Sequence, residues 1–399
     1  MPGFEWFGDA ERKEVSQVME TGVLMRYGFD AKREGVWKCK ELEALISEKF
    51  GVNHCQLTSS GTTALNTALA VAGIGAGDEV IVPTFTFVAT FESILNVGAI
   101  PIIVDIDESL TLDPKAVIRA ITPKTKAIIP VHMCGCAADL DALMSICEEH
   151  KLILIEDACQ ATGASYKGKS LGSFGAMGCF SFDYVKIITM GEGGALITND
   201  PELAKRADAY TDHGHDHIGT DRGAESHPFL GTNYRVNELN AAIGIAQFNR
   251  LEDILRTNRR NKAYLKGRIA AEVPEIKFRI NHSGDEDNAT FLSFFLPDTE
   301  KARQAQSELS KAGVGAVFHY FDNNWHYIRK WNHLKDRSSL NKLSKEIEEG
   351  MPDYSKITFP VSDDIIGRNL SMLINLSWTE EELHKKGDAM VEILKNCVG

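Results

Sequence analysis

Short apolar runs separated by helical patterns constrain the fold of this chain more than any other feature. The runs are rich in β-branched residues and lie at residues 78–87, 99–106, 125–133 and 151–157. Between two of them, residues 113–122 begin with Asp113 and Pro114, an N-cap followed by proline in the first helical turn. Strands that are apolar on both faces and alternate with helices predict a mostly parallel α/β sheet covered on both sides.

The second half of the chain has a different pattern. Residues 237–269 predict a long helical region, and three further strands are expected among charged helices at 290–297, 314–320 and 370–377. A chain of 399 residues exceeds the size at which one core keeps growing. We therefore predict a large α/β domain over residues 1–255 and a smaller α+β domain over residues 256–399.

Charge and composition exclude several classes of partner. The formal net charge of −13 argues against nucleic acid, because nucleic-acid binders carry a basic face. No apolar run reaches the roughly 18 residues of a membrane span, and the N-terminus lacks the regions of a secretion signal. The eight cysteines form no repeating framework, which is typical of reduced thiols. We expect a cytoplasmic protein with no membrane partner.

The stretch "SSGTTAL" (59–65) is a candidate phosphate site. Gly61 allows close backbone approach, and Thr62 and Thr63 add hydroxyl groups beside the free N–H groups of a helix start. The stretch lacks the Gly-Lys-Ser/Thr ending of a nucleotide loop, which favours a single phosphate. Small residues at this place also serve helix–sheet packing, so the stretch alone does not establish a phosphate site.

Two charged residues follow neighbouring strands. Asp157 in "IEDACQATG" stands at the carboxyl end of a strand, where it is either a helix cap or a carboxylate that protonates a pyridine nitrogen. Lys186 lies 29 positions later, one strand on, and is a loop charge, a phosphate ligand or a nucleophile. Both can meet at one sheet edge. With the phosphate stretch, they supply what pyridoxal 5′-phosphate (PLP) requires.

Two groups of possible metal ligands do not support a metal site. His132, Cys134 and Cys136 lack a second pair of ligands at the spacing of a zinc finger. The histidines at positions 213, 215 and 217 alternate in a polar loop, which more often faces solvent or substrate. We predict no metal.

Five motifs in order resemble one family. They are "SSGTTAL", "VPTFTFVAT", "IEDACQATG", "GCFSFDYVKIITMGEGGALITND" and "GTNYRVNELNAAIG". From about residue 8 to the C-terminus the chain resembles the DegT/DnrJ/EryC1/StrS sugar aminotransferases, which are PLP enzymes. The resemblance implies the aspartate-aminotransferase fold (type I), whose large domain has a mostly parallel seven-stranded sheet and whose C-terminal domain is smaller.

The resemblance also implies roles for individual residues. Lys186 would bind PLP as an imine and carry the proton between substrate and cofactor, and Asp157 would pair with the pyridine nitrogen. Gln160 would contact the phenolic oxygen of the ring, and Phe87 would stack on its face. The phosphate would be held at Gly61, Thr62, Thr63 and Ser181. Asn233 would reach the phosphate from the neighbouring subunit, which implies a homodimer with shared sites.

Within the family, "SFDYVK…T.GEGGA" and "LSMLINLSWTEEE" most resemble the 8-amino-3,8-dideoxy-manno-octulosonate aminotransferases of lipopolysaccharide biosynthesis. L-Glutamate would then aminate 3-deoxy-8-oxo-manno-octulosonate. The alternatives are a nucleotide-linked keto-hexose as acceptor, or a PLP-binding regulator without turnover, which would need a basic DNA-binding module. Residues proposed to meet acidic substrates are Arg26, His215, His217, Arg235 and His319.

Two positions beside the lysine bear on the reaction. Many members of the family have "FHPTK" where this chain has "FDYVK", which changes the surroundings of Lys186 and predicts an altered substrate choice. A dehydratase branch of the family carries histidine in place of the lysine. Because position 186 is lysine here, the resemblance favours transamination over dehydration.

Overall fold

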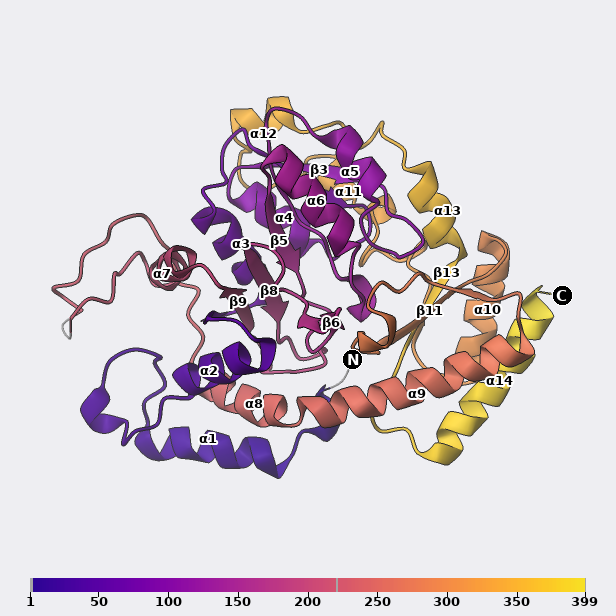
Figure 1. Ribbon diagram of the computed structural model, residues 1–399, viewed down its shortest axis with the longest axis horizontal. Helices are drawn as coiled ribbons and strands as arrows, with labels where there is room; N and C mark the ends of the chain where they lie inside the picture. Colours follow the sequence, from indigo (N-terminus) through magenta and orange to yellow (C-terminus); the bar gives the residue numbers. More distant parts are fainter. Residues whose placement is uncertain (1–2, 220–221, 399) are drawn as a thin grey trace.

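A seven-stranded sheet forms the centre of the larger half of the computed structural model, which describes residues 3–219 and 222–398 (Figure 1). The strands lie in the order β1-β9-β8-β5-β4-β2-β3. Their bounds are His54–Thr58 (β1), Glu79–Pro83 (β2), Ile100–Val104 (β3), Thr125–Ile128 (β4), Ile153–Asp157 (β5), Met177–Ser181 (β8) and Gly194–Thr198 (β9). Only β9 is antiparallel to its neighbours in this sheet. The mostly parallel seven-stranded sheet is confirmed.

Helices cover both faces of this sheet, as its continuous apolar strands predicted. One face packs against α3 (Gly61–Val71), α4 (Ala89–Asn96) and α7 (Pro201–Tyr210). The other face packs against α2 (Lys38–Phe50), α5 (Pro114–Ala120), α6 (Leu140–His150) and α8 (Glu238–Asn249). Every residue of β2, β8 and β9 is buried between the two layers. A short hairpin of β6 (Ser165–Tyr166) and β7 (Lys169–Ser170) lies beside the sheet.

The helical region predicted over residues 237–269 consists of two helices. α8 ends at Asn249, and α9 (Leu251–Glu272) begins after Arg250, whose φ of −108° and ψ of 9° interrupt the helix. The Arg250 guanidinium donates to the carbonyl of Trp6 and pairs with Glu11 of α1 (Asp9–Thr21) at 2.8 Å. The N-terminal segment thus holds the break in place.

A four-stranded antiparallel sheet forms the smaller C-terminal unit, with the order β10-β11-β13-β12. Its strands are Lys277–Phe278 (β10), Phe291–Phe295 (β11), Val317–Phe318 (β12) and Asn369–Leu373 (β13). Three helices complete its core, namely α9, α10 (Thr299–Lys311) and α14 (Glu380–Val398). In Figure 1, α9 runs from the large sheet to this unit, with α14 alongside. The smaller α+β unit is confirmed.

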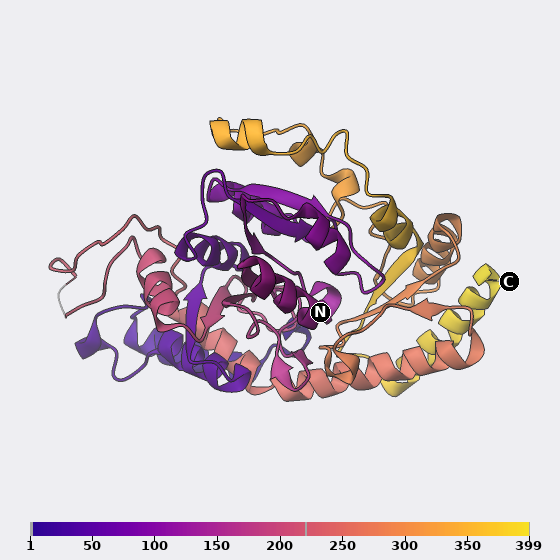
Figure 2. The same cartoon turned by 45° about the horizontal axis from the view of Figure 1, so that its top comes forward.

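One C-terminal segment packs on the large sheet instead. It contains α11 (Asn332–Lys335), α12 (Lys345–Gly350) and the start of α13 (Pro360–Arg368). Figures 1 and 2 both place α12 over β3, and Trp331 and Ile347 share a core with Ile100. The division between residues 255 and 256 falls inside α9 and stays a prediction. In the described ranges, no helix has the length and apolarity that crossing a membrane requires.

Candidate active site

The ends of three strands meet at one edge of the large sheet. β1 ends at Thr58, directly before the start of α3, and β5 ends at Asp157. β8 pairs in parallel with β5, with Asp157 opposite Cys179, so Ser181 and the turn that carries Lys186 follow at the same edge. The chain encloses a cavity of ≈ 560 Å³ there.

Seven of the nine predicted cofactor residues line this cavity. They are Gly61, Thr62, Phe87, Asp157, Gln160, Ser181 and Lys186. Thr63 does not line it, because its hydroxyl accepts the N–H of Ser60 at 2.9 Å in the cap of α3. Asn233 lies away from the cavity of its own chain, in an isolated bridge with Asp212.

The start of α3 offers unpaired backbone donors to the cavity. Ser60 is the N-cap and satisfies two of the first N–H groups, through its hydroxyl to Thr63 (3.1 Å) and its carbonyl to Ala64 (3.1 Å). Within the described residues, the N–H groups of Gly61 and Thr62 have no hydrogen-bond acceptor. A helix start with free N–H groups is an anion site.

Gly61 is required by the close packing under this helix start. A Cβ at position 61 would lie 2.7 Å from Cβ of Ser181 and 2.9 Å from Sγ of Cys159. The α3 start is therefore pressed against the end of β8. This contact brings Ser181, at the end of β8, to the same part of the cavity as Gly61 and Thr62.

Asp157 is buried and held by two hydrogen bonds. The Thr90 hydroxyl donates to its Oδ2 at 2.7 Å, and the N–H of Cys159 donates to its Oδ1 at 3.1 Å. The Thr86 hydroxyl lies 2.7 Å from that of Thr90, so the two threonines form a chain that ends on the carboxylate. Asp157 is not a helix cap, since the residues that follow it form no helix.

Lys186 sits in the turn that follows β8, where its side chain is half-buried. Its N–H donates to the carbonyl of Asp183 at 3.0 Å, and its carbonyl accepts the N–H of Gly3 at 3.1 Å. Gly3 belongs to the short 3-10 helix Gly3–Trp6, which no sequence motif marks as functional. The turn is thus fixed from both sides while the amine reaches the cavity.

Aromatic side chains form one wall of the cavity, and sequence reasoning missed most of them. Phe87 is 47% exposed there, and its ring lies 5.6 Å from that of His326. The Nδ1 atom of His326 is buried without a hydrogen-bond partner. Burial lowers the pKa of His326 to about 3, and the nearby charge of Lys186 adds to the shift. His326 is therefore a neutral imidazole at the cavity. Tyr320 and Trp325 come from the same segment.

The five residues predicted to meet acidic substrates do not line this cavity. Arg26 pairs with Glu43 at 2.7 Å, Arg235 pairs with Asp212, and His215 pairs with Glu225 at 2.8 Å. The Nδ1 atom of His319 contacts Asp322 at 3.1 Å, and its Nε2 donates to the carbonyl of Gly367 at 2.8 Å. Each is already engaged within its own chain.

His217 belongs to an ion network in the same region. Its two ring nitrogens contact Asp208 at 2.6 Å and Asp212 at 2.9 Å. Burial alone would lower the pKa of His217, but the hydrogen bonds to the two carboxylates raise it to about 9. Arg222 joins His217 and Arg235 on Asp212, at 2.8 Å. The network ties the loop after α7 to Tyr27, whose hydroxyl donates to Asp208.

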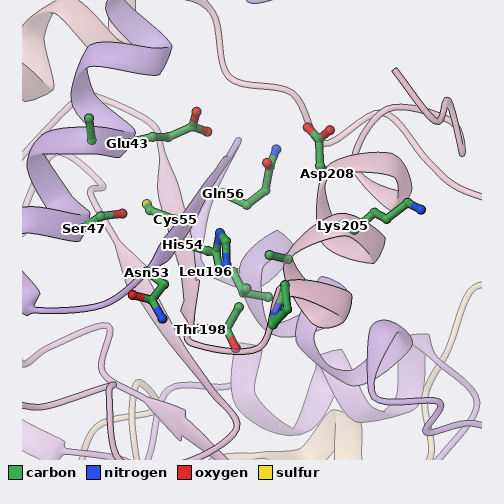
Figure 3. Close-up of a pocket in the computed structure, with 13 residues that line it drawn as sticks. Glu43, Ser47, Asn53, His54, Cys55, Gln56, Leu196, Thr198, Lys205 and Asp208 are labelled. Carbon is green, nitrogen blue, oxygen red and sulfur yellow. The ribbon is translucent and has the colours of Figure 1, made fainter. Parts of the chain in front are cut away.

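A second cavity, of ≈ 510 Å³, lies against the edge strand β1 (Figure 3). Side chains of α2, β1, β9 and α7 surround it, including Glu43, His54, Lys205 and Asp208. None of the nine predicted cofactor residues is among the described residues that line it. The chemistry of the predicted site belongs to the other cavity.

The residues at the strand ends fit PLP. The free N–H groups of Gly61 and Thr62, with Ser181 beside them, suit a phosphate, and Gly61 is the residue that lets the helix start lie this close to the end of β8. Asp157 is a buried carboxylate suited to a pyridinium nitrogen, and Lys186 is an amine that opens onto the same cavity. Phe87 offers an exposed ring face for stacking.

Comparison with known proteins agrees with this geometry. Residues 8–385 match the model of the DegT/DnrJ/EryC1/StrS aminotransferase family. The chain is 41% identical over 239 residues (58% of this chain) to an L-glutamine:2-deoxy-scyllo-inosose aminotransferase of Micromonospora echinospora. It is also 41% identical over 231 residues (58% of this chain) to a GDP-perosamine synthase of Caulobacter vibrioides. These matches span 57% and 61% of the two relatives.

A solved structure extends the likeness to the whole chain. The aminotransferase from Psychrobacter cryohalolentis superposes with a TM-score of 0.83 at 27% identity, covering 98% of each chain. The two-unit architecture is therefore that of a known fold. The chain belongs to the DegT/DnrJ/EryC1/StrS aminotransferase family and has the type I fold of PLP-dependent aminotransferases.

Proposed function

We propose that this protein is a PLP-dependent sugar aminotransferase, which moves an amino group from L-glutamate to the carbonyl carbon of a sugar. The observation that carries the proposal is the cavity at the strand ends, into which Lys186, Asp157 and the α3 start all open. A phosphate site, a pyridinium partner and an amine in one cavity are the set that this chemistry needs.

Each residue has a distinct task in this proposal. Lys186 would hold the cofactor, and its amine would carry a proton to and from the reacting carbon. Asp157, oriented by Thr90, keeps the pyridine nitrogen protonated. PLP itself supplies an electron sink when bound. The α3 start and Ser181 would hold the phosphate, and Phe87 would offer its exposed ring face to the cofactor.

The acceptor we propose is 3-deoxy-8-oxo-manno-octulosonate. Its amination would be a step of lipopolysaccharide biosynthesis. This choice rests on the likeness of "SFDYVK" and "LSMLINLSWTEEE" to the enzymes that aminate this sugar. A nucleotide-linked keto-hexose is the second candidate, supported by the similarity to GDP-perosamine synthase. L-Glutamine is the competing donor, supported by the name of the inosose relative.

We also propose a homodimer with shared sites, in the cytoplasm. Asn233 lies outside the cavity of its own chain, where it bridges Asp212 at the end of α7. The cations suited to substrate carboxylates, Arg26 and Arg235, are paired away from the cavity. A second copy would bring such loop residues to the first.

The decisive experiment tests Lys186. Purified protein with PLP should be yellow, and borohydride should fix the cofactor to the peptide that contains Lys186, as mass spectrometry would show. Lys186→Ala should leave the fold intact and reduce transamination from L-glutamate by roughly 10²–10⁴-fold or more. Lys115→Ala, on the exposed surface, is the control. A colourless wild type, or turnover retained in Lys186→Ala, would refute the proposal.

A further inference from the structure

The N-terminal segment lies against the turn that carries Lys186. The N–H of Gly3 donates to the carbonyl of Lys186 at 3.1 Å, and the ring of Phe4 stacks on Tyr184 at 4.7 Å and 7°. A Cβ at Gly3 would lie 2.6 Å from the carbonyl oxygen of Ile187, so the contact admits only glycine. Two residues of this segment, Phe4 and Glu5, line the cavity.

Glu5 brings a half-satisfied carboxylate to this wall. It lines the cavity, and its Oε2 accepts the N–H of Ser377 at 2.7 Å. Its Oε1 is buried and has no hydrogen-bond partner in the described part of the chain. A buried acceptor without a donor costs free energy, and a ligand that donates a hydrogen bond removes this cost.

The charges around the cavity decide what kind of ligand can approach Glu5. Four of the described lining residues are carboxylates, namely Glu5, Asp157, Asp183 and Glu192, whereas Lys186 is the one lysine or arginine among them. His326 adds no charge, as its pKa of about 3 keeps it neutral. Carboxylates of a donor amino acid are repelled by Glu5, while neutral hydroxyl groups are attracted.

We propose that Glu5 selects the acceptor, by accepting a hydrogen bond from a sugar hydroxyl close to the reacting carbonyl. The inference rests on the proposed function and names the part of the acceptor that the site reads. Both candidate acceptors carry hydroxyls beside the carbonyl, and their anionic groups lie farther along the molecule. An acceptor that places its neutral hydroxyl groups at Glu5 and its anionic group farther away fits the carboxylates that line the cavity.

The test is Glu5→Gln, measured separately in the two half-reactions. Glutamine keeps an oxygen for the N–H of Ser377 but replaces the free acceptor by an NH₂ donor. PLP-loaded enzyme is mixed with L-glutamate, and the aminated enzyme is mixed with 3-deoxy-8-oxo-manno-octulosonate or a thymidine-diphosphate-linked 4-keto-6-deoxy-hexose, both followed by absorbance. The acceptor kcat/KM should fall about ten- to hundredfold, and the donor half-reaction should change less than about twofold.

The possible outcomes separate this inference from the proposed function. Glu20→Gln, an equally conservative change on the exposed face of α1, should alter neither half-reaction. Glu5 is structural if Glu5→Gln slows both half-reactions equally, or if it lowers the melting temperature without changing the acceptor kcat/KM. In either case the inference fails while the proposed function stands. If the wild type lacks the donor half-reaction, or aminates neither sugar, the proposed function fails and the inference with it.

Discussion

At the scale of single residues, the orientation of Asp157 depends on Thr90. The hydroxyl of Thr90 donates to one carboxylate oxygen and accepts from the hydroxyl of Thr86, so the carboxylate cannot rotate freely. Thr90→Val keeps the shape of the side chain and removes this donor. We expect kcat to fall about tenfold, because Asp157 then holds the pyridinium proton less well.

The measurement for Thr90 combines kinetics with a spectroscopic titration. The absorbance of bound PLP, followed against pH, should shift in Thr90→Val and remain as in the wild type in Thr90→Ser, which keeps the hydroxyl. An unchanged spectrum and an unchanged kcat in Thr90→Val would show that the N–H of Cys159 alone orients the carboxylate.

The residues that sequence could predict at the site are those that follow strands. Lys186 and Asp157 stand directly after apolar runs, and neighbouring parallel strands place them at one edge. Glu5 and His326 have no such local signal. They reach the cavity because residues 3–6 pack on the Lys186 turn and because the segment after β12 returns to the large sheet. Such contacts are set by tertiary packing.

At the scale of elements, the start of α3 depends on a glycine. Gly61→Ala would place a Cβ within 2.7 Å of Cβ of Ser181, and neither atom can move without its backbone. We expect the free energy of unfolding to fall by about 1–3 kcal/mol. The Kd for PLP should rise at least tenfold, about 1.4 kcal/mol, because the helix start and Ser181 separate.

Urea denaturation and a fluorescence titration with PLP measure these two effects. The matched control is Gly267→Ala in α9, where a Cβ would meet nothing within 4 Å. That change should raise stability by about 0.5–1 kcal/mol, since alanine is the better helix former. A Gly61→Ala protein with wild-type stability and PLP affinity would contradict the close contact between α3 and β8.

The loop after α7 should make stability depend on pH. In the folded protein the pKa of His217 is about 9, above the value of about 6.5 expected in the unfolded chain. A raised pKa stabilises the fold fully below pH 6.5, and this contribution is lost as the pH rises through 9. We expect the free energy of unfolding to decrease by about 1–3 kcal/mol over this range.

Urea denaturation at pH 6, 7.5 and 9.5, values chosen to span the range from about 6.5 to 9, checks this expectation. His217→Asn should be less stable than the wild type at pH 6 and lose most of the difference at the highest pH. His150→Asn, at the exposed end of α6, should follow the wild type. Parallel curves for His217→Asn and the wild type would mean that Asp208 and Asp212 do not hold the proton.

The elements themselves were predictable where one local pattern dominated. Runs such as 99–106 and 151–157 are buried on both faces and became β3 and β5 within three residues at each end. The break at Arg250 was not predictable, because the apolar spacing continues through it and the cause is a contact with Trp6 and Glu11. Local sequence does not record such partners.

At the scale of the whole molecule, shared sites predict that two inactive variants restore activity when their subunits combine in one dimer. In a homodimer whose sites take Lys186 from one chain and Asn233 from the other, Lys186→Ala and Asn233→Ala each damage both sites. A mixed dimer of the two variants places both substitutions in one site and leaves the second site intact. Random exchange of equal amounts should therefore restore about a quarter of wild-type activity.

The experiment mixes the two purified variants under conditions that allow subunits to exchange and follows transamination from L-glutamate over time. The control is Lys186→Ala mixed with the double variant Lys186→Ala/Asn233→Ala. This mixture should stay inactive because neither chain has a lysine at position 186. The mixture could instead show only the sum of the activities of the two separate variants. In that case Asn233 and Lys186 either belong to the site of the same chain, or Asn233 belongs to no site. That result would leave the cavity of each chain complete by itself, and the segment that carries Asn233 would need another role.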